Sequence, residues 1–125
     1  MHPTTARQGE IRLVLTPGQP DDPHQPRPAI VVSENIRNLR TDDLTIVPVF
    51  SSMRLGPTHI LIPKGVGGID HDSVAHCEEI TTLQQRFLVE GPLGPPIPLR
   101  LLRQIIRAVR RSMGEVVTEP LHDAP

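Results

Sequence analysis

The residue types best suited to chemistry gather between positions 70 and 79, where histidines alternate with acidic side chains. Asp70, His71 and Asp72 stand together, and His76 follows shortly after. Carboxylates and imidazoles are common ligands of divalent metals. Neighbouring residues of a strand, however, point to opposite faces, so an Asp-His-Asp run is a poor chelate unless the glycine-rich turn before it bends the chain. The sequence therefore predicts polar turn residues here and no metal or other cofactor.

Cys77 is the only cysteine, and it directly follows His76. A thiol beside an imidazole can act as a nucleophile, but no third residue that would orient the histidine is evident. A buried structural cysteine is the commoner outcome. One cysteine also excludes an internal disulfide and a thiolate metal cage within a single chain.

Arginine accounts for every one of the 13 basic side chains except Lys64. The planar guanidinium suits phosphate well, although a GC-rich genome would give the same bias. Five arginines occupy the polar side of a C-terminal helical pattern: Arg100, Arg103, Arg107, Arg110 and Arg111. A solvated helix face explains them best, and phosphate binding is the alternative. The formal net charge of −1 argues against coating of nucleic acid by bulk electrostatics.

Short apolar segments predict the strands that must position these groups. Residues 9–15 alternate apolar Ile11, Leu13 and Leu15 with polar Glu10 and Arg12. Further extended segments are predicted at 29–33, 44–50, 58–63 and 73–83, and Pro48 suggests that the third of these five is an edge strand or carries a bulge. Uninterrupted alternation in the last segment would place Val74, His76, Glu78 and Ile80 on one face and Ala75, Cys77 and Glu79 on the other. Strands at these spacings are typical of a small barrel.

The remaining segments predict loops and one helix. Residues 16–28 form a loop stiffened by prolines, and loops of this length are often functional. Residues 34–43 are a polar connector, whereas the glycines in 64–72 permit a turn with positive φ. Residues 99–114 predict a helix with one apolar face, made of Leu102, Ile105, Ile106, Val109 and Met113. Pro98 suits its first turn and Gly114 its C-terminal cap.

A chain of 125 residues fits one domain. We expect this domain at 9–114, with an N-terminal extension at 1–8 and a mobile tail at 115–125. No run of about 18 apolar residues and no secretory signal are present, which predicts a soluble, cytoplasmic protein without membrane association. Phe50 and Phe87 are the only Phe, Tyr or Trp residues, which argues against a base-stacking platform.

Six segments together carry a resemblance to a known family. They are GEIRLV at 9–14, RPAIVV at 27–32, IVPVFSS at 46–52, PTHILIP at 57–63, DSVAHCEEITTL at 72–83 and the final helix. Their order and approximate spacing resemble those of the MazF/PemK toxins of the Kid/CcdB superfamily. The resemblance covers roughly residues 8–114.

This resemblance implies an SH3-like, CcdB/PemK-type barrel of five to seven short strands with a C-terminal helix. It also implies a homodimeric type II toxin that cleaves single-stranded RNA at short motifs without a metal and is neutralised by a MazE-like antitoxin. In such enzymes the 2′-hydroxyl attacks the neighbouring phosphate and leaves a 2′,3′-cyclic phosphate and a 5′-hydroxyl. A toxin of the same fold that binds a protein target such as gyrase is the alternative, and an RNA-binding barrel without cleavage is a third reading.

The resemblance places the catalytic pair at Arg27 and Ser51. Arginine stays protonated, so Arg27 would stabilise the charge that develops on the phosphate rather than abstract a proton. Ser51 would add one hydrogen bond. RNA contacts are implied for Asp22, His24, Gln25, Ser52, Glu78 and Glu79. Because the pair leaves the proton transfers without an agent, we also consider His24 as a proton carrier. An ordinary surface position is the alternative for His24.

Three departures from the family pattern stand out. Arg12 occupies a position where relatives carry tryptophan or another large residue. Prolines replace the glycines of the relatives' first loop. Ser51 replaces the usual threonine, which keeps the hydroxyl but frees its rotamer.

Overall fold

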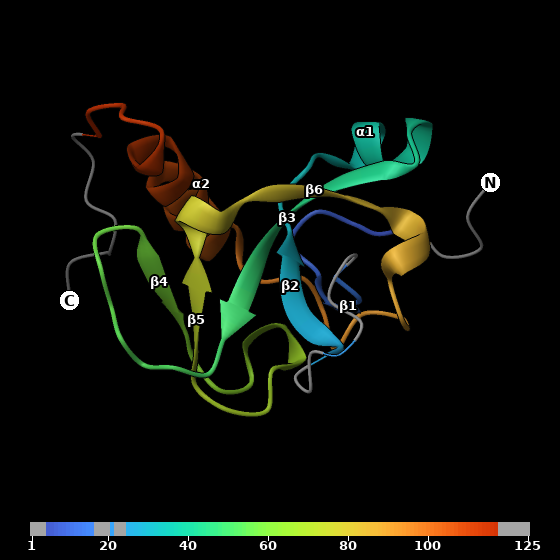
Figure 1. Cartoon of the computed structure of the whole chain (residues 1–125), viewed down its shortest axis with the longest axis horizontal. Coiled ribbons are helices and arrows are strands. Elements are labelled where there is room, and N and C mark those ends of the chain that lie inside the picture. Colours follow the sequence, from blue (N-terminus) through green and yellow to red (C-terminus); the bar gives the residue numbers. More distant parts are fainter. Residues whose placement is uncertain (1–4, 17–20, 22–24, 118–125) are drawn as a thin grey trace.

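The structure, a computed structural model, describes residues 5–16, 21 and 25–117. Within them six strands and two α-helices follow one another, with three short 3-10 turns between them (Figure 1). The strands are β1 (Ile11–Val14), β2 (Arg27–Val31), β3 (Asp43–Phe50), β4 (His59–Ile62), β5 (Ser73–His76) and β6 (Thr81–Gln84). The helices are α1 (Asn35–Arg40) and α2 (Leu99–Ser112), and the 3-10 turns are η1 (Val66–Gly68), η2 (Cys77–Glu79) and η3 (Gln85–Phe87). The predicted mainly β architecture with a C-terminal helix is confirmed.

Strand β3 organises the sheet, whose order is β1-β2-β3-β5-β4, with β6 also paired to β3. All pairings are antiparallel. One side of β3 pairs with β2, whereas the other side pairs first with β6 at 43–46 and then with β5 at 49–50. The sheet therefore divides at β3 into one part with β1, β2 and β6 and another with β5 and β4.

Pro48 lies where β3 changes partner. It pairs with Ala29 of β2, and on its other side the β6 pairing ends at Ile46 and the β5 pairing begins at Val49. The expectation of an edge strand or a bulge at Pro48 was wrong, because β3 is central. A proline is tolerated here because the missing N–H falls in the gap between the two partner strands.

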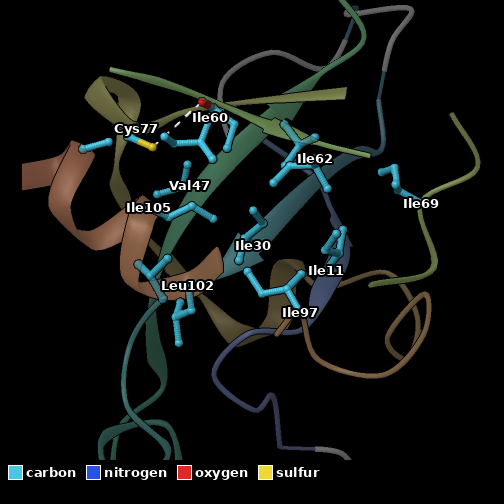
Figure 2. Close-up of a cluster of buried hydrophobic side chains, with 14 residues drawn as sticks. Ile11, Ile30, Val47, Ile60, Ile62, Ile69, Cys77, Ile97, Leu102 and Ile105 are labelled. Carbon is cyan, nitrogen blue, oxygen red and sulfur yellow. Dashed lines mark hydrogen bonds between the residues drawn. The ribbon is translucent and has the colours of Figure 1, made fainter. Parts of the chain in front are cut away.

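Apolar side chains fill both faces of the sheet. The larger cluster takes Ile30 from β2, Val47 from β3 and Ile60 from β4, and α2 covers it with Leu102 and Ile105 (Figure 2). The smaller cluster lies on the other face and contains Ala29, Val31, Leu44, Ile46 and Leu83. Adjacent residues such as Ala29 and Ile30 thus belong to different clusters, as strand alternation requires. Strands with two buried faces explain the nearly continuous apolar runs in the sequence.

The first strand departs from its predicted alternation. Ile11 is buried as expected, but Leu15 is exposed, and polar Glu10 and Arg12 are buried at 7% and 2% exposure. Arg12 is buried because its guanidinium bonds to Glu10 and to the carbonyl oxygen of Glu90. Glu90 lies in the segment after η3, which runs along β1 through backbone hydrogen bonds from Val89 and Leu93 to Leu13 and Ile11. A strand covered on both faces has no polar side to present to water.

Two other predicted segments differ from the structure. Residues 34–43, expected to be a polar connector, contain α1, whose Asn38 side chain is buried and bonded to Ser33. Residues 73–83 do not continue as one strand, because η2 separates β5 from β6. The alternation predicted beyond His76 is therefore wrong.

Helix α2 begins after Pro98 and ends at Ser112, close to the predicted bounds. Leu102 and Ile105 are buried as predicted, but Ile106 and Met113 are exposed, while Ala108 and Gln104 are buried instead. The buried stripe is thus rotated relative to the predicted one. Gly114 has φ of 91°, as expected of a C-terminal cap, and Glu115 then pairs with Arg110.

The glycine-rich turn at 64–72 is held against the linker that precedes α2. Gly68 has φ of 88°, and a Cβ atom there would lie 2.3 Å from the carbonyl oxygen of Leu93. Only glycine fits both the backbone conformation and the space. The predicted positive-φ turn is confirmed, and it fixes the segment that carries His71 into β5.

Candidate active site

Arg27 lies at the start of β2, beside the end of β3. The β2–β3 register pairs Ala29 with Pro48, so continuing it by two residues sets Arg27 opposite Phe50. The guanidinium carbon of Arg27 lies 5.4 Å from the centre of the Phe50 ring. A cation over an aromatic face at this distance is attracted by the ring's quadrupole. The antiparallel pairing therefore joins two segments that are distant in the sequence.

A pocket of about 390 Å³ opens at this place. Its lining includes Arg27 and Ser51, the two residues predicted to be catalytic, together with Ser52, His71 and Ser73. Ser51 and Ser52 are exposed, and Arg27 is half-buried. Ser73 is buried and its hydroxyl donates to the carbonyl oxygen of His71. The Arg27 guanidinium and the hydroxyl groups of Ser51 and Ser52 are therefore the hydrogen-bond donors suited to an anion in this open pocket.

A second pocket, of about 320 Å³, shares Arg27, Pro28 and Phe50 with the first. Its other polar lining residues are Thr16, Glu79 and Thr81. Arg27 thus faces two adjoining hollows, one with Ser51 and one with Glu79. Together they form a groove across the ends of β2 and β3, which we call the Arg27 groove.

A histidine and glutamate cluster adjoins the groove behind Phe50. The β4–β5 register pairs His59 with His76, and their rings stack with centres 4.2 Å apart. The other neighbour of His76 is Phe50, at 4.3 Å between ring centres. His59 Nε2 lies 3.1 Å from Glu78 Oε2, and His76 Nδ1 lies 3.0 Å from Glu79 Oε2. Each imidazole therefore holds one carboxylate.

Glu78 is held more firmly than Glu79. Partial burial is the largest influence on Glu78 and raises its pKa, but hydrogen bonds from its own backbone N–H, from Thr58 and from His59 together outweigh it. The net result is a lowered pKa, so the Glu78 carboxylate is favoured in its charged form. The Thr58 hydroxyl donates to Glu78 Oε1 at 2.8 Å.

His59, His76 and Glu78 are the three described residues close enough together to hold a metal ion. Asp70, His71 and Asp72, considered above as metal ligands and predicted to be polar turn residues, do not form such a group. The two imidazole planes of the cluster differ by only 16°, however. Imidazole lone pairs lie in the ring plane, so two stacked rings direct them along nearly parallel planes rather than at one point. The geometry favours carboxylate binding over chelation.

The chain matches the family model described as a PemK-like, MazF-like toxin of type II toxin-antitoxin systems over residues 7–113. The chain belongs to this family. The match spans both strands that build the Arg27 groove and the whole of α2. No curated protein matches significantly.

Solved structures of similar fold agree with this toxin family. MazF from Deinococcus radiodurans superposes with a TM-score of 0.73 at 21% identity, over 90% of this chain and 99% of that one. An endoribonuclease from a mycobacterial species gives 0.72 at 20% identity, over 94% and 97%. A mycobacterial endoribonuclease in complex with its cognate antitoxin gives 0.70 at 21% identity, over 87% and 95%.

The residues expected to contact RNA in this PemK-like toxin do not all line the Arg27 groove. Ser52 lines the groove beside Ser51, and Glu79 lines it on the other side. Glu78 instead faces Thr58 and His59. The Gln25 side chain exchanges hydrogen bonds with the backbone of Thr16 and so joins the two ends of the proline-rich loop.

Asp22 and His24 lie outside the described residues, so the expected RNA contacts and the proton-carrier hypothesis stay predictions for this toxin. The described part of the chain resumes at Gln25, which is joined to Pro26 by a cis peptide bond.

Sequence reasoning missed one histidine of the Arg27 groove and one of the adjoining cluster. His59 was not considered, and His71 was weighed only as a metal ligand, although it lines the groove with Ser51. His71 Nδ1 is paired with Asp70. The register of β4 on β5 would have revealed His59, but pairing between strands cannot be derived from alternation within each strand.

Cys77 is structural, as the sequence predicted. Its side chain is fully buried, and burial followed by the nearby Glu78 charge raises its pKa to about 12. A thiol that keeps its proton is a poor nucleophile. Figure 2 shows its sulfur within the larger apolar cluster, away from solvent.

Proposed function

We propose that this toxin is an endoribonuclease that cleaves single-stranded RNA at the Arg27 groove. The observation that carries the proposal is that Arg27 and Ser51, from different strands, line one open pocket. Family membership and the fold shared with endoribonucleases support it. They support the nuclease over the gyrase-binding alternative.

The chemistry follows from the groups in this pocket. The RNA 2′-hydroxyl attacks the neighbouring phosphorus, and the 5′-oxygen of the next nucleotide leaves, which gives a 2′,3′-cyclic phosphate and a 5′-hydroxyl. Negative charge grows on the non-bridging oxygens during the attack. The Arg27 guanidinium supplies charged donors to those oxygens, and the Ser51 hydroxyl adds one donor. This chemistry needs no metal.

The toxin also needs partners to be controlled in a cell. We propose a MazE-like antitoxin, because neighbours of this fold include MazE-MazF complexes. We also propose a homodimer, which the resemblance to the MazF/PemK toxins implies. No described helix is long and apolar enough to cross a bilayer. Action on mRNA places the toxin in the cytoplasm.

The test is cleavage of a long RNA of defined sequence by the purified chain in EDTA, followed by mapping of both product ends. We expect 5′-hydroxyl and 2′,3′-cyclic phosphate ends at a few short motifs. The Arg27→Ala variant should bind RNA but leave its length unchanged. Cutting that EDTA abolishes, or that Arg27→Ala retains in full, would overturn the proposal.

RNA whose migration shifts in a salt-dependent way while its length stays constant would instead identify a binding protein without cleavage. A gyrase supercoiling assay with the same preparation tests the protein-target alternative. Inhibition of gyrase without RNA cutting would favour that alternative.

A further inference from the structure

The pair Arg27 and Ser51 provides no acceptor for the proton of the attacking 2′-hydroxyl. Arginine cannot accept it, because the guanidinium stays protonated. Ser51 offers a neutral hydroxyl, which is a weak base. A positioned carboxylate or imidazole in the same groove is required for general base catalysis.

We propose that Glu79 is the general base of this toxin and that His76 is its positioning residue. This inference rests on the proposed ribonuclease function. Glu79 lines the groove pocket that also contains Arg27 and Phe50, whereas Ser51 lines the adjoining pocket. A phosphate bound at Arg27 therefore has the hydroxyl group of Ser51 in one hollow and the Glu79 carboxylate in the other.

His76 holds Glu79 in place through one hydrogen bond. Its Nδ1 donates to Glu79 Oε2 at 3.0 Å, while Nε2 is buried and has no hydrogen-bond partner among the described residues. The ring is clamped between Phe50 and His59. Because Phe50 also carries Arg27 on its ring, the same aromatic side chain sets the position of the base and of the guanidinium.

Glu78 does not meet the same requirement. Both of its oxygens already accept hydrogen bonds, Oε1 from Thr58 and Oε2 from His59. Its lowered pKa also makes it a weaker proton acceptor. Glu79, in contrast, uses Oε2 toward His76 and keeps Oε1 without a hydrogen bond to any described residue. Its side chain is 51% exposed, so substrate can reach it.

The proton balance of the step is complete. The bond from the 2′-oxygen to phosphorus forms as the 2′-hydroxyl proton passes to Glu79. The bond from phosphorus to the 5′-oxygen breaks, and that oxygen takes a proton from water in the open pocket. Glu79 then returns its proton to solvent.

The charged and ionisable groups around Glu79 come from several elements. His76 contacts it directly, Glu78 precedes it in η2, and His59 reaches the cluster from β4. Arg27 faces the same pocket from β2. The pH dependence of cleavage therefore belongs to this group, and Glu79 must be identified by substitution as well as by pH.

The decisive variant is Glu79→Gln, which keeps the shape and the hydrogen bond acceptor but removes the base. With saturating RNA in EDTA, kcat should fall by about 10²- to 10⁴-fold with KM nearly unchanged. The acidic limb of the pH profile should disappear. Glu34→Gln is the matched control, because Glu34 is an exposed glutamate beside α1 without a side-chain cap bond.

Chemical rescue separates a base from a binding group. Glu79→Ala should regain part of its activity on addition of formate, whereas Glu34→Ala should not respond. His76→Gln should lower kcat by about tenfold and alter the pH profile while KM stays the same. Thermal melts must show that each variant is folded. A folded Glu79→Gln variant with wild-type kcat and pH profile would overturn the inference.

This result can be told apart from failure of the proposed function. If wild-type chain cuts RNA in an Arg27-dependent way and Glu79→Gln cuts equally well, only the role of Glu79 fails. If the wild-type chain does not cut RNA, the proposed function fails, and the inference fails with it.

Discussion

Arg12 and Arg27 lie on paired strands, yet the fold uses them in opposite ways. Arg12 is 2% exposed, with Nη1 3.1 Å from Glu10 Oε1 and with Nε and Nη2 both donating to the carbonyl oxygen of Glu90. Arg27 is half-buried and lines the open groove. Arg12 therefore ties β1 to the segment that covers it, and Arg27 lines the groove that we propose binds RNA.

The contrast shows that environment, not residue type, decides what a guanidinium does. A buried guanidinium is tolerated only when its donors are matched, as Glu10 and Glu90 match those of Arg12. A guanidinium that lines a groove can donate hydrogen bonds to an anion bound there. Stability and activity should therefore separate when the two arginines are changed.

The largest effect is expected from Arg12→Ala. Loss of the guanidinium leaves the Glu10 carboxylate buried without its ion-pair partner, which costs about 3–5 kcal/mol in the free energy of unfolding. Urea unfolding measures it. RNA cleavage by the folded fraction at low temperature should stay within about threefold of wild type, since Arg12 does not line the groove. Glu10→Gln combined with Arg12→Met should restore much of the stability. Equal stability of Arg12→Ala and wild type would contradict the structural role of Arg12 and thus its contrast with Arg27.

Arg27→Lys should produce the reverse pattern. The charge remains, but the planar fork that matches a phosphate is lost, and kcat/KM should fall by about 10²-fold. The free energy of unfolding should change by less than about 0.5 kcal/mol, as for other surface substitutions. Steady-state cleavage and urea unfolding of one preparation give both numbers. A large loss of stability would show that Arg27 is structural like Arg12.

Ser51→Ala should have a smaller effect on activity. It removes one neutral donor beside a charged one, and we expect kcat to fall by about tenfold without a change in stability. Ser51→Thr should equal or exceed wild type, because the β-branched side chain restricts the hydroxyl rotamer. An alanine variant with full activity would show that the Ser51 hydroxyl is not needed beside Arg27.

The smallest effect concerns Glu78, the carboxylate that His59 and Thr58 hold beside the Arg27 groove. Thr58→Val removes one of the hydrogen bonds that lower the pKa of Glu78. A lowered folded-state pKa stabilises the fold above the unfolded value of 4.5 and loses this contribution as pH falls through the folded value. Thr58→Val should therefore be less stable than wild type at pH 7, by under about 1 kcal/mol because Glu78 is partly exposed. The difference should shrink between pH 7 and pH 3. Thermal melts at both values test this, and a difference that grows toward low pH would contradict it.

The sequence predicted the strands and the long helix because their signals are local. Alternation and apolar runs identified the β2, β3 and β4 segments, and Gly114 marked the end of α2. The prediction failed where the burial of a side chain depends on which segment packs against its strand or helix. Arg12 was expected on a polar face, and Ile106 was expected in the core. The burial of Arg12 depends on the segment that packs beside β1, and the exposure of Ile106 depends on the rotation of α2. Neither feature can be read from the local sequence.

The site was predicted in part. Arg27 and Ser51 followed from the resemblance, and the structure sets both around one pocket. The stack of Phe50, His76 and His59 did not follow, because it depends on β3 pairing with β5 and β5 with β4. The η2 turn was also unforeseen, and it decides that Glu78 and Glu79 face different neighbours.

The change of partner at Pro48 gives the groove a mechanical property. Arg27 belongs to the part of the sheet with β1, β2 and β6, whereas His76 belongs to the part with β4 and β5, and Glu79 lies in the η2 turn that links β5 to β6. Only β3 joins these two parts through strand pairing in the described chain. An RNA strand that lies across the groove would therefore contact both parts of the sheet and restrict their motion relative to each other. Its binding should slow amide hydrogen exchange on both sides of Pro48, including at residues that it does not touch.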